Sequence, residues 1–500
     1  MADRGLTRRS LLGAAGGSLA ALARAPRALG AAVDGAAGRS SRARGEPPLP
    51  AGQVGERALG LLGPGLVTLA LSGSADLLAL GWAEPPGAGP QLRFRTPEGA
   101  WSPWVAAAHA AHDGDHDAAA PPPGVVGEPV WSGGTRLVQV RSAHALAGAR
   151  LYTVDVSGGA GAARLAAATQ ARVGAAATPP LAGPQLAAGP GQPPIVAREF
   201  WARGQCPPSR APAYGAVELG FVHHTETPNG YSHGEVPAML RAIYVFHRRV
   251  RRWHDIGYNF ALDRFGRIFE ARAGGIDEAV IGAQAGGYNA YSTGVALLGT
   301  FTGRPLSSAA LTSLQRLLAW KLSLHGVPAL GRVTVTVDPE GAVYSRYPGG
   351  SEVSLPRIAG HRDADSTSCP GNALYGELPA VRARAHALAG TPVQATIATL
   401  DGGLFGTLTL LDGTPLEGQP LTLQSRAVSR RGELVAENPV AQVQTDAEGQ
   451  WTLPEGPPPA QPQWLRALFA GAGPYGAAVS EAVAARPPAP PVPVAPAPAG

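Results

Sequence analysis

Hydrophobic and polar positions alternate in two parts of the chain, which lie on either side of a central part with a different pattern. Between residues 50 and 157, runs such as LVTLAL, QLRFR and RLYTVDV alternate with a period of two, and Gly, Pro and Ser separate them. Residues 391–486 alternate in the same way, in ATIATL, FGTLTLL and QPLTLQSR. Such runs are typical of antiparallel sheets with one buried face. We therefore predict two all-β domains, each a small β-sandwich.

The central part, residues 196–390, mixes strand-like runs with helical periodicity. Apolar residues at steps of three and four predict one helix that opens at Ser232 and Glu235, which have capping-box spacing, and a second over residues 308–325. His247 falls on the apolar stripe of the first helix, so we interpret it as a core residue rather than a ligand.

Strand-like runs in the same part predict two hairpins. YNFALD and RIFEA flank a tight turn, and VTVTV and AVYSR flank DPEG. With the strand VELGFV before His223, the central part reads as a mixed β-sheet flanked by helices. The fold class is therefore a multidomain chain with a central α/β domain between two all-β sandwich-like accessory domains.

Composition and the N-terminus define the remaining segments. With 67 Gly and 49 Pro, part of the chain must be linker or tail, and residues 158–195 and 487–500 have that composition. Residues 1–32 contain Arg8 and Arg9 before a weakly apolar run, which resembles a twin-arginine signal peptide. We expect a protein secreted to the bacterial cell envelope by the twin-arginine route, without stable membrane insertion after signal cleavage.

The net charge of the chain argues against one class of partner, nucleic acids. A net charge of +5 on 500 residues gives little support for nucleic-acid binding. The segment AHAAHDGDHD, with His109, His112 and His116, offers metal-binding residue types, but its Ala- and Pro-rich surroundings favour a solvated loop.

Candidate metal ligands occur at the ends of strand-like runs. His223 and His224 close FVHH, and because successive strand residues face opposite sides, one of the two is expected to reach a common cavity. His361 and Cys369 bracket a loop rich in Gly, Asp and Ser. Two His and one Cys with an open fourth position suit catalytic zinc.

Two other interpretations of the cysteines remain. Cys206 and Cys369 are the two cysteines of an exported chain, so a disulfide competes with the metal site. A twin-arginine substrate folds in the reducing cytoplasm, which favours the thiolate. A cysteine protease with Cys369 as nucleophile and His361 as base leaves His223 unexplained.

Five motifs occur in one order: FVHHTET, WHDIGYNF, GAQAGGYN, STGVALLGTF and GHRDADSTSCPG. Residues 198–384, which contain them, resemble peptidoglycan recognition proteins and zinc-dependent N-acetylmuramoyl-L-alanine amidases. The resemblance implies that His223, His361 and Cys369 bind Zn²⁺ and that Tyr258 and Thr367 are catalytic. It places His224, Gln284 and Asn289 in a substrate groove. Gln284 departs from the family, since many relatives carry His there, which puts substrate contacts or rate in doubt.

The function expected from this resemblance is hydrolysis of the amide bond between N-acetylmuramic acid and L-alanine in peptidoglycan. In the expected reaction Tyr258 and Thr367 donate hydrogen bonds to the oxyanion, and no general base is assigned. The alternatives are a non-catalytic protein that binds muramyl peptides and a structural protein of the envelope. Members of the family that only bind typically lack the cysteine ligand, so Cys369 favours the enzyme.

Overall fold

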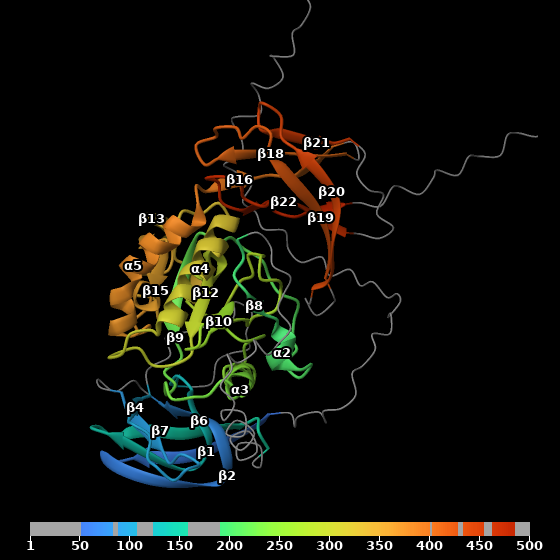
Figure 1. Cartoon of the computed structure of the whole chain (residues 1–500). Helices are drawn as coiled ribbons and strands as arrows, with labels where there is room; N and C mark the ends of the chain where they lie inside the picture. The colour runs from blue at the N-terminus through green and yellow to red at the C-terminus, as the bar shows by residue number, and fades with distance from the viewer. Residues whose placement is uncertain are drawn as a thin grey trace, which may run out of the picture. The chain divides into compact units, whose positions relative to one another are not determined.

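The computed structural model describes residues 52–83, 89–107, 124–158, 191–400, 403–428, 434–454 and 463–485 (Figure 1). The predicted signal peptide, the His109–His116 loop, most of the predicted linker and the Pro/Ala tail lie outside these residues. Among the helices in the described ranges, none is long and apolar enough to cross a membrane.

The N-terminal domain is one antiparallel sheet with the strand order β1-β7-β2-β6-β3-β4, and β5 pairs with β2. Its strands are β1 (Gln53–Leu62), β2 (Gly65–Trp82), β3 (Gln91–Phe94), β4 (Val105–Ala106), β5 (Val125–Val126), β6 (Val130–Ser142) and β7 (Leu146–Asp155). The expected all-β character is present, but the strands form one sheet rather than two. The long strand β2 explains the difference. It pairs with β5, β6 and β7, so these strands belong to one continuous sheet.

The central domain is built on a six-stranded mixed sheet with the order β15-β9-β12-β10-β11-β8. Only β10 and β11 pair antiparallel; the other neighbours are parallel. The strands are β8 (Ile195–Val196), β9 (Leu219–His224), β10 (Phe260–Leu262), β11 (Ile268–Glu270), β12 (Ser292–Leu297) and β15 (Ile358–Gly360). The helices are α2 (Arg198–Ala202), α3 (Val236–Arg249), α4 (Ser308–Leu324) and α5 (Asn372–Ala389).

Alternation along the central strands determines which helices cover which face. On β10, Ala261 belongs to the hydrophobic cluster that contains α3, whereas Phe260 and Leu262 belong to the cluster that contains α4 and α5. Helix α3 therefore covers one face of the sheet, and α4 with α5 covers the other, which confirms a mixed sheet flanked by helices. The cluster around α3 also takes in Leu77 and Trp131 of the N-terminal sheet.

Local predictions in this domain have mixed outcomes. The hairpin of β10 and β11 and the helix α4 are confirmed. Helix α3 begins at Val236, after the predicted cap, because the carboxylate of Glu235 accepts hydrogen bonds from the backbone N–H and hydroxyl of Ser232 and holds a turn there.

The second predicted hairpin has the wrong partner strand. The first strand, β13 (Arg332–Thr336), pairs with β14 (Glu352–Pro356) and not with AVYSR. Val353 and Leu355 of β14 are buried in the same cluster as Val335, whereas Val343 is 76% exposed. Burial of the alternating face thus selects the later segment. Residues 339–341 form a 3-10 turn, η4 (Pro339–Gly341), between the two strands.

The C-terminal domain consists of two antiparallel sheets that share one hydrophobic cluster. One sheet contains β16 (Val393–Ala395), β17 (Ala398–Leu400), β18 (Gly403–Leu410) and β21 (Gln450–Leu453). The other contains β19 (Pro420–Val428), β20 (Leu434–Gln444), β22 (Gln463–Phe469), β23 (Ala478–Val479) and β24 (Val483–Ala485). Residues of both sheets, among them Leu408 and Phe469, are fully buried in that cluster, so two layers enclose one core.

Candidate metal centre

Two neighbouring parallel strands bring the predicted histidines together. In the pairing of β15 with β9, Gly360 lies opposite Val222, and each strand residue is followed directly by a histidine, His361 and His223 respectively. Because the carboxyl ends of parallel strands meet at the same edge of a sheet, the two rings converge, with centroids 4.5 Å apart. His361 opens the short turn η5 (His361–Asp363), and the loop after it returns Cys369 to the same place.

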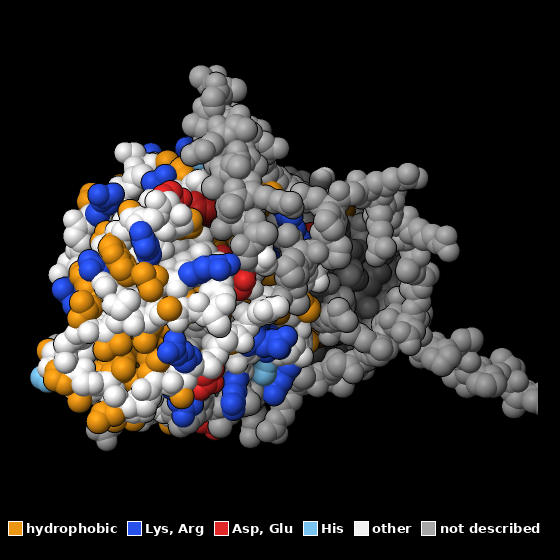
Figure 2. All heavy atoms as spheres, turned by 90° about the horizontal axis from the view of Figure 1, so that it is seen from below, with side chains coloured by type: hydrophobic (Ala, Val, Ile, Leu, Met, Phe, Trp, Pro, Cys, Tyr) orange, Lys and Arg blue, Asp and Glu red, His pale blue; other side chains and the backbone are white. Residues whose placement is uncertain are grey.

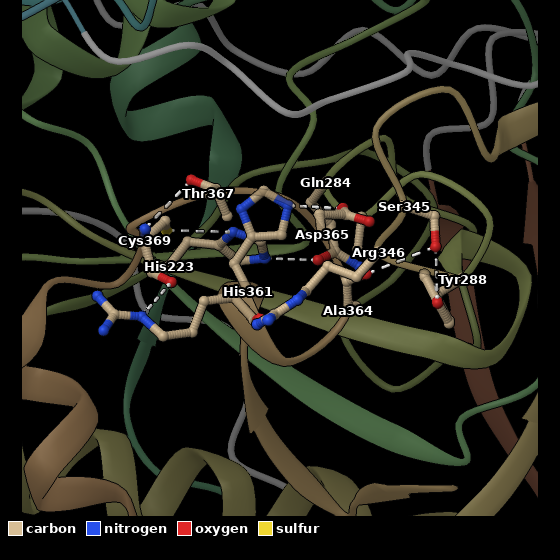
Figure 3. Close-up of polar contacts among 12 residues, drawn as sticks. His223, Gln284, Tyr288, Ser345, Arg346, His361, Ala364, Asp365, Thr367 and Cys369 are labelled. Atoms are coloured by element: carbon tan, nitrogen blue, oxygen red, sulfur yellow. Dashed lines mark hydrogen bonds and ion pairs between the residues drawn. The ribbon is translucent and has the colours of Figure 1, made fainter. Parts of the chain in front are cut away.

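The three side chains form a compact donor set (Figure 3). One possible ligand atom each from His223, His361 and Cys369 lies within 4.8 Å of the others, and all three residues are buried. Cys369 Sγ is 3.8 Å from His223 Nδ1. Two imidazole nitrogens and one thiolate sulfur fit the ligand preferences of zinc with a fourth position left for water or substrate.

A buried amide holds His223 in a defined orientation. Gln284 Oε1 lies 2.6 Å from His223 Nε2, and Gln284 Nε2 donates to Ser292 Oγ at 2.8 Å. Since the amide N–H group of Gln284 is directed to Ser292, its oxygen is the atom that accepts the Nε2–H of His223. This tautomer leaves the lone pair of Nδ1 directed at the donor set, as a metal ligand requires.

The carboxylate of Asp365 holds the ring of His361 in a defined orientation. Asp365 Oδ2 lies 2.8 Å from His361 Nε2, and Asp365 is fully buried. With Nε2–H donated to the carboxylate, Nδ1 is the nitrogen that faces the donor set. A carboxylate behind a histidine ligand fixes the ring and raises its basicity. Asp365 was not predicted from the sequence, although its position four residues after a candidate histidine was a usable signal.

Burial controls the protonation of Cys369. Burial raises the pKa of its thiol well above the ordinary value, while the backbone N–H of His224, 3.4 Å from Sγ, lowers it. A divalent cation at the donor set favours the thiolate directly. Cys206 is a free, buried thiol whose pKa burial raises to about 12, and the two cysteines are not joined by a disulfide.

Tyr258 lies beside the donor set. Its ring centroid is 5.4 Å from that of His223, and its side chain is 3% exposed. Burial, with a contribution from the negative charge of Glu128, raises the pKa of Tyr258 well above 10. The phenol therefore keeps its proton at neutral pH and is able to donate a hydrogen bond.

Glu128 was not identified from the sequence. It follows β5 in the N-terminal domain and is 8% exposed. Nη2 of Arg251 donates to the carbonyl oxygens of Val126 and Gly127 at 2.6 and 3.4 Å, which anchors the segment before Glu128. Its charge raises the pKa of Cys369 as well as that of Tyr258, after burial in both cases. Nothing in the sequence marks one Glu of a β-rich segment as a neighbour of distant histidine motifs.

Comparison with known proteins identifies the central domain. A family model described as N-acetylmuramoyl-L-alanine amidase matches residues 213–372. A peptidoglycan-recognition protein of Drosophila melanogaster is 30% identical over 185 residues, which are 37% of this chain and 85% of that protein. The chain belongs to the family of peptidoglycan-recognition proteins and type 2 amidases.

Other matches lie in the same part of the chain. N-acetylmuramoyl-L-alanine amidase of Mus musculus is 31% identical over 180 residues, 35% of this chain and 28% of that protein. Among solved structures, wild-type Drosophila PGRP-LB matches at 25% identity and a TM-score of 0.29, covering 37% of this chain and 91% of that one. A second family model, described as Rv3811 N-terminal galactose-binding domain-like, matches residues 65–178. The amidase-family resemblance thus covers the central domain, and a separate family model resembles most of the N-terminal sheet.

His224 and Gln284 are both buried in this amidase-family domain. His224 is 2% exposed; its Nε2 is 2.7 Å from Glu226 Oε1, and its Nδ1 accepts from the backbone N–H of Phe301. It faces the opposite side of β9 from His223, as the strand alternation predicted. Gln284 is fully buried behind His223 instead of at a groove surface.

Asn289 and Thr367 both make local bonds to the backbone. Asn289 Oδ1 accepts from the backbone N–H groups of Gln284 and Ala285 and so holds the loop that carries Gln284. Thr367 Oγ1 accepts from the backbone N–H of Cys369 at 3.2 Å. Thr367 therefore shapes the loop of a candidate ligand, and its catalytic role stays a prediction. His247 is a hydrogen-bonded core residue, with Nδ1 accepting from Gly257 N–H.

Proposed function

We propose that the chain is a zinc-dependent N-acetylmuramoyl-L-alanine amidase, which hydrolyses the amide bond between the lactyl group of N-acetylmuramic acid and L-alanine in peptidoglycan. The observation that carries this proposal is the convergence of His223, His361 and Cys369 within 4.8 Å beside the protonated phenol of Tyr258. A site with these donors suits an enzyme better than a protein that only binds. Family membership supplies the substrate class.

The residues of the chain divide the work of the reaction. When bound, zinc supplies Lewis acidity, which polarises a carbonyl and lowers the pKa of water to about 7. Gln284 and Asp365 hold the two imidazoles with Nδ1 toward the donor set. The Tyr258 hydroxyl donates a hydrogen bond to the amide oxygen as negative charge develops there, and a donor of this kind contributes about a hundred- to thousandfold in rate.

We also propose that the enzyme acts outside the cytoplasm after export by the twin-arginine route. The support is the Arg8-Arg9 pair before an apolar run and the location of peptidoglycan itself. Replacing both arginines with lysine in the producing cell is expected to retain the protein inside. Equal amounts of the variant and the natural chain in the envelope would contradict export by this route.

The test of the enzyme is hydrolysis of purified sacculi by the full chain. We expect about one zinc per chain and release of stem peptides that begin with L-alanine, detected by mass spectrometry. Cys369→Ala is expected to abolish both, whereas Cys206→Ala, which removes the other buried thiol, leaves the zinc and the cleavage position unchanged. A protein that binds sacculi with or without zinc and releases no peptide would be a recognition protein instead.

A further inference from the structure

One face of the N-terminal sheet carries a set of polar side chains that the proposed reaction does not use. On β3 and β6, apolar residues alternate with polar ones, and the apolar set is buried in the core of the domain. The polar set on the opposite face consists of Gln91, Arg93, Gln139 and Arg141. Because the strand register places Gln91 opposite Arg141 and Arg93 opposite Gln139, each arginine lies across from a glutamine.

Two tryptophans from the segment between β3 and β4 interleave with these arginines. The guanidinium of Arg93 lies 4.9 Å from the ring centroid of Trp101 and 4.6 Å from that of Trp104. The guanidinium of Arg141 lies 4.2 Å from the centroid of Trp104. The result is an alternating stack, Trp101, Arg93, Trp104 and Arg141, which we call the Arg–Trp stack.

Hydrogen bonds fix the orientation of both guanidinium groups. Arg93 Nε donates to Gln139 Oε1 and Arg141 Nε donates to Gln91 Oε1, each at 2.7 Å. Gln139 is held in turn, since its Nε2 donates to Thr68 Oγ1 at 3.0 Å. Only the Nε–H of each arginine is used in these bonds. Within the described ranges, no carboxylate pairs with Arg93 or Arg141, so their terminal N–H groups are positioned to bind an anion.

The Arg–Trp stack is accessible. Trp101 is 36% exposed, Trp104 is half-buried and Arg141 is exposed. Figure 2 looks at the molecule from the side where Figure 1 draws this sheet, and arginine side chains recur there among hydrophobic ones, with fewer acidic side chains. A flat aromatic surface beside fixed guanidinium groups suits a ligand with an apolar ring face and a carboxylate, because arginine forms bidentate bonds with carboxylates.

Hydrolysis of the lactyl amide generates such a ligand. Water adds across the C–N bond, the carbonyl carbon keeps the hydroxyl and the L-alanine nitrogen takes the proton. The resulting lactyl acid ionises at neutral pH, so the glycan gains one carboxylate for each peptide removed. This step rests on the proposed function, whereas the binding chemistry of the Arg–Trp stack does not.

We propose that the Arg–Trp stack binds the peptide-free glycan strand through its lactyl carboxylates. Arg93 and Arg141 bind the carboxylates, and the exposed ring of Trp101 packs against a sugar ring. The N-terminal domain then holds the enzyme on the strand from which it has already removed peptides. Released stem peptides also carry carboxylates but offer no sugar ring, so the stack discriminates against them.

The test measures binding to glycan strands stripped of peptide by an unrelated amidase, so it does not depend on the activity of this chain. The full-length chain is expected to bind these strands more tightly than neutral chitin oligosaccharides or isolated stem peptides. Binding is expected to weaken as salt rises from about 50 to about 300 mM, since exposed charge pairs are screened (about 8 Å Debye length at 0.15 M).

Variants locate the binding to the stack. Arg93→Gln with Arg141→Gln is expected to weaken binding about tenfold or more, in line with the loss of two charge-assisted contacts. Arg93→Lys with Arg141→Lys, which keeps the charge but not the planar donor pair, is expected to fall between this variant and the natural chain. The control removes the same charge elsewhere, with Arg57→Gln on β1 and Arg304→Gln in the central domain, both exposed.

Three results would overturn the proposal. They are equal binding of the Gln pair and the natural chain, an equal loss in the control pair, and binding of stem peptides or chitin as tight as that of the stripped strands. Circular dichroism and thermal unfolding of each variant separate lost binding from lost folding. A chain that binds stripped strands but releases no peptide from sacculi would disprove the proposed amidase and leave the stack intact.

Discussion

The candidate metal centre and the Arg–Trp stack both join polar side chains from neighbouring strands, but they differ in burial. At the centre, His223, His361 and Cys369 are 0%, 1% and 8% exposed, and buried Gln284 and Asp365 orient the histidines. In the stack, Trp101 is 36% exposed and the arginines are held by glutamines.

This difference in burial suits the two sites to different tasks, a reaction at the buried site and reversible binding at the exposed one. In the centre, burial changes proton affinities, as the raised pKa values of Cys369 and Tyr258 show, and it keeps each ligand atom in one orientation. An exposed stack keeps its charge and exchanges water for ligand at low cost, which suits reversible contact with a polymer.

Neighbouring histidines on β9 test the centre most severely. His223→Ala removes a proposed ligand, and we expect loss of bound zinc and at least about a thousandfold fall in peptide release. His224→Ala is the matched control, because it lies on the other side of the strand and pairs with Glu226. Zinc is measured per folded chain by elemental mass spectrometry. Equal zinc loss in both variants would contradict the proposal that His223, and not His224 on the opposite face of β9, binds the metal.

Tyr258→Phe keeps the ring and removes the hydroxyl. In the proposed reaction the phenol donates to the developing oxyanion, so kcat is expected to fall about a hundredfold, with KM and zinc content little changed. Steady-state kinetics on a soluble muramyl peptide measures the split. An unchanged kcat in Tyr258→Phe would show that Tyr258 only packs in the core and does not take part in the reaction.

Asp365→Asn tests the support behind His361. The amide replaces a carboxylate that accepts the Nε2–H, and zinc affinity is expected to fall about 10- to 100-fold. Competition with a zinc-binding dye measures the affinity. Asp412→Asn, at an exposed turn of the C-terminal domain, is the control and should not change it. Unchanged affinity in Asp365→Asn would mean that His361 needs no such partner.

Burial also acts on the N-terminal sheet, away from its exposed stack. Desolvation raises the pKa of Asp76 from 3.8 to about 6, although its carboxylate accepts from the backbone N–H of Val156 and Ser157. The folded state binds the proton of Asp76 more tightly than the unfolded state does. The contribution of this group to the stability of the fold is therefore complete below about pH 4 and is lost as pH rises through about 6.

The predicted size of that loss is on the order of 2–3 kcal/mol in the free energy of unfolding. Asp76→Asn does not titrate and should flatten this part of the pH dependence. Urea unfolding monitored by tryptophan fluorescence between about pH 4 and about pH 7 compares the two chains. Parallel curves for the natural chain and the variant would show that Asp76 has an ordinary pKa in the fold.

The sequence predicted the three residues of the donor set better than the residues that surround and orient them. His223 and His361 were identifiable because each lies at the end of a strand or directly after one, and Cys369 because it ends the loop that His361 begins. The contacts of Gln284 and Glu128 depend on how separate loops meet, and no spacing along the chain encodes that. Asp365 differs, because it lies only four residues after His361. Gln284 was expected at a groove, but it is buried against His223.

Errors in the fold have the same origin. Alternation predicted strands in each domain, yet it did not select β14 over AVYSR, because the selection depends on which segment buries its apolar face. Helix α5 was not predicted, since its sequence is rich in Ala and contains Pro379, which weakens the periodic signal. Local pattern therefore predicts element type, while burial decides the partner.

Zinc K-edge X-ray absorption of the purified full chain tests the metal centre most directly. Two histidines and one cysteine predict one sulfur at about 2.3 Å and nitrogen or oxygen neighbours at about 2.0–2.1 Å, four in total. Cys206→Ala should keep the sulfur signal, whereas Cys369→Ala should retain no bound zinc. A zinc shell without sulfur in the natural chain, or a sulfur signal that follows Cys206, would contradict the proposed centre.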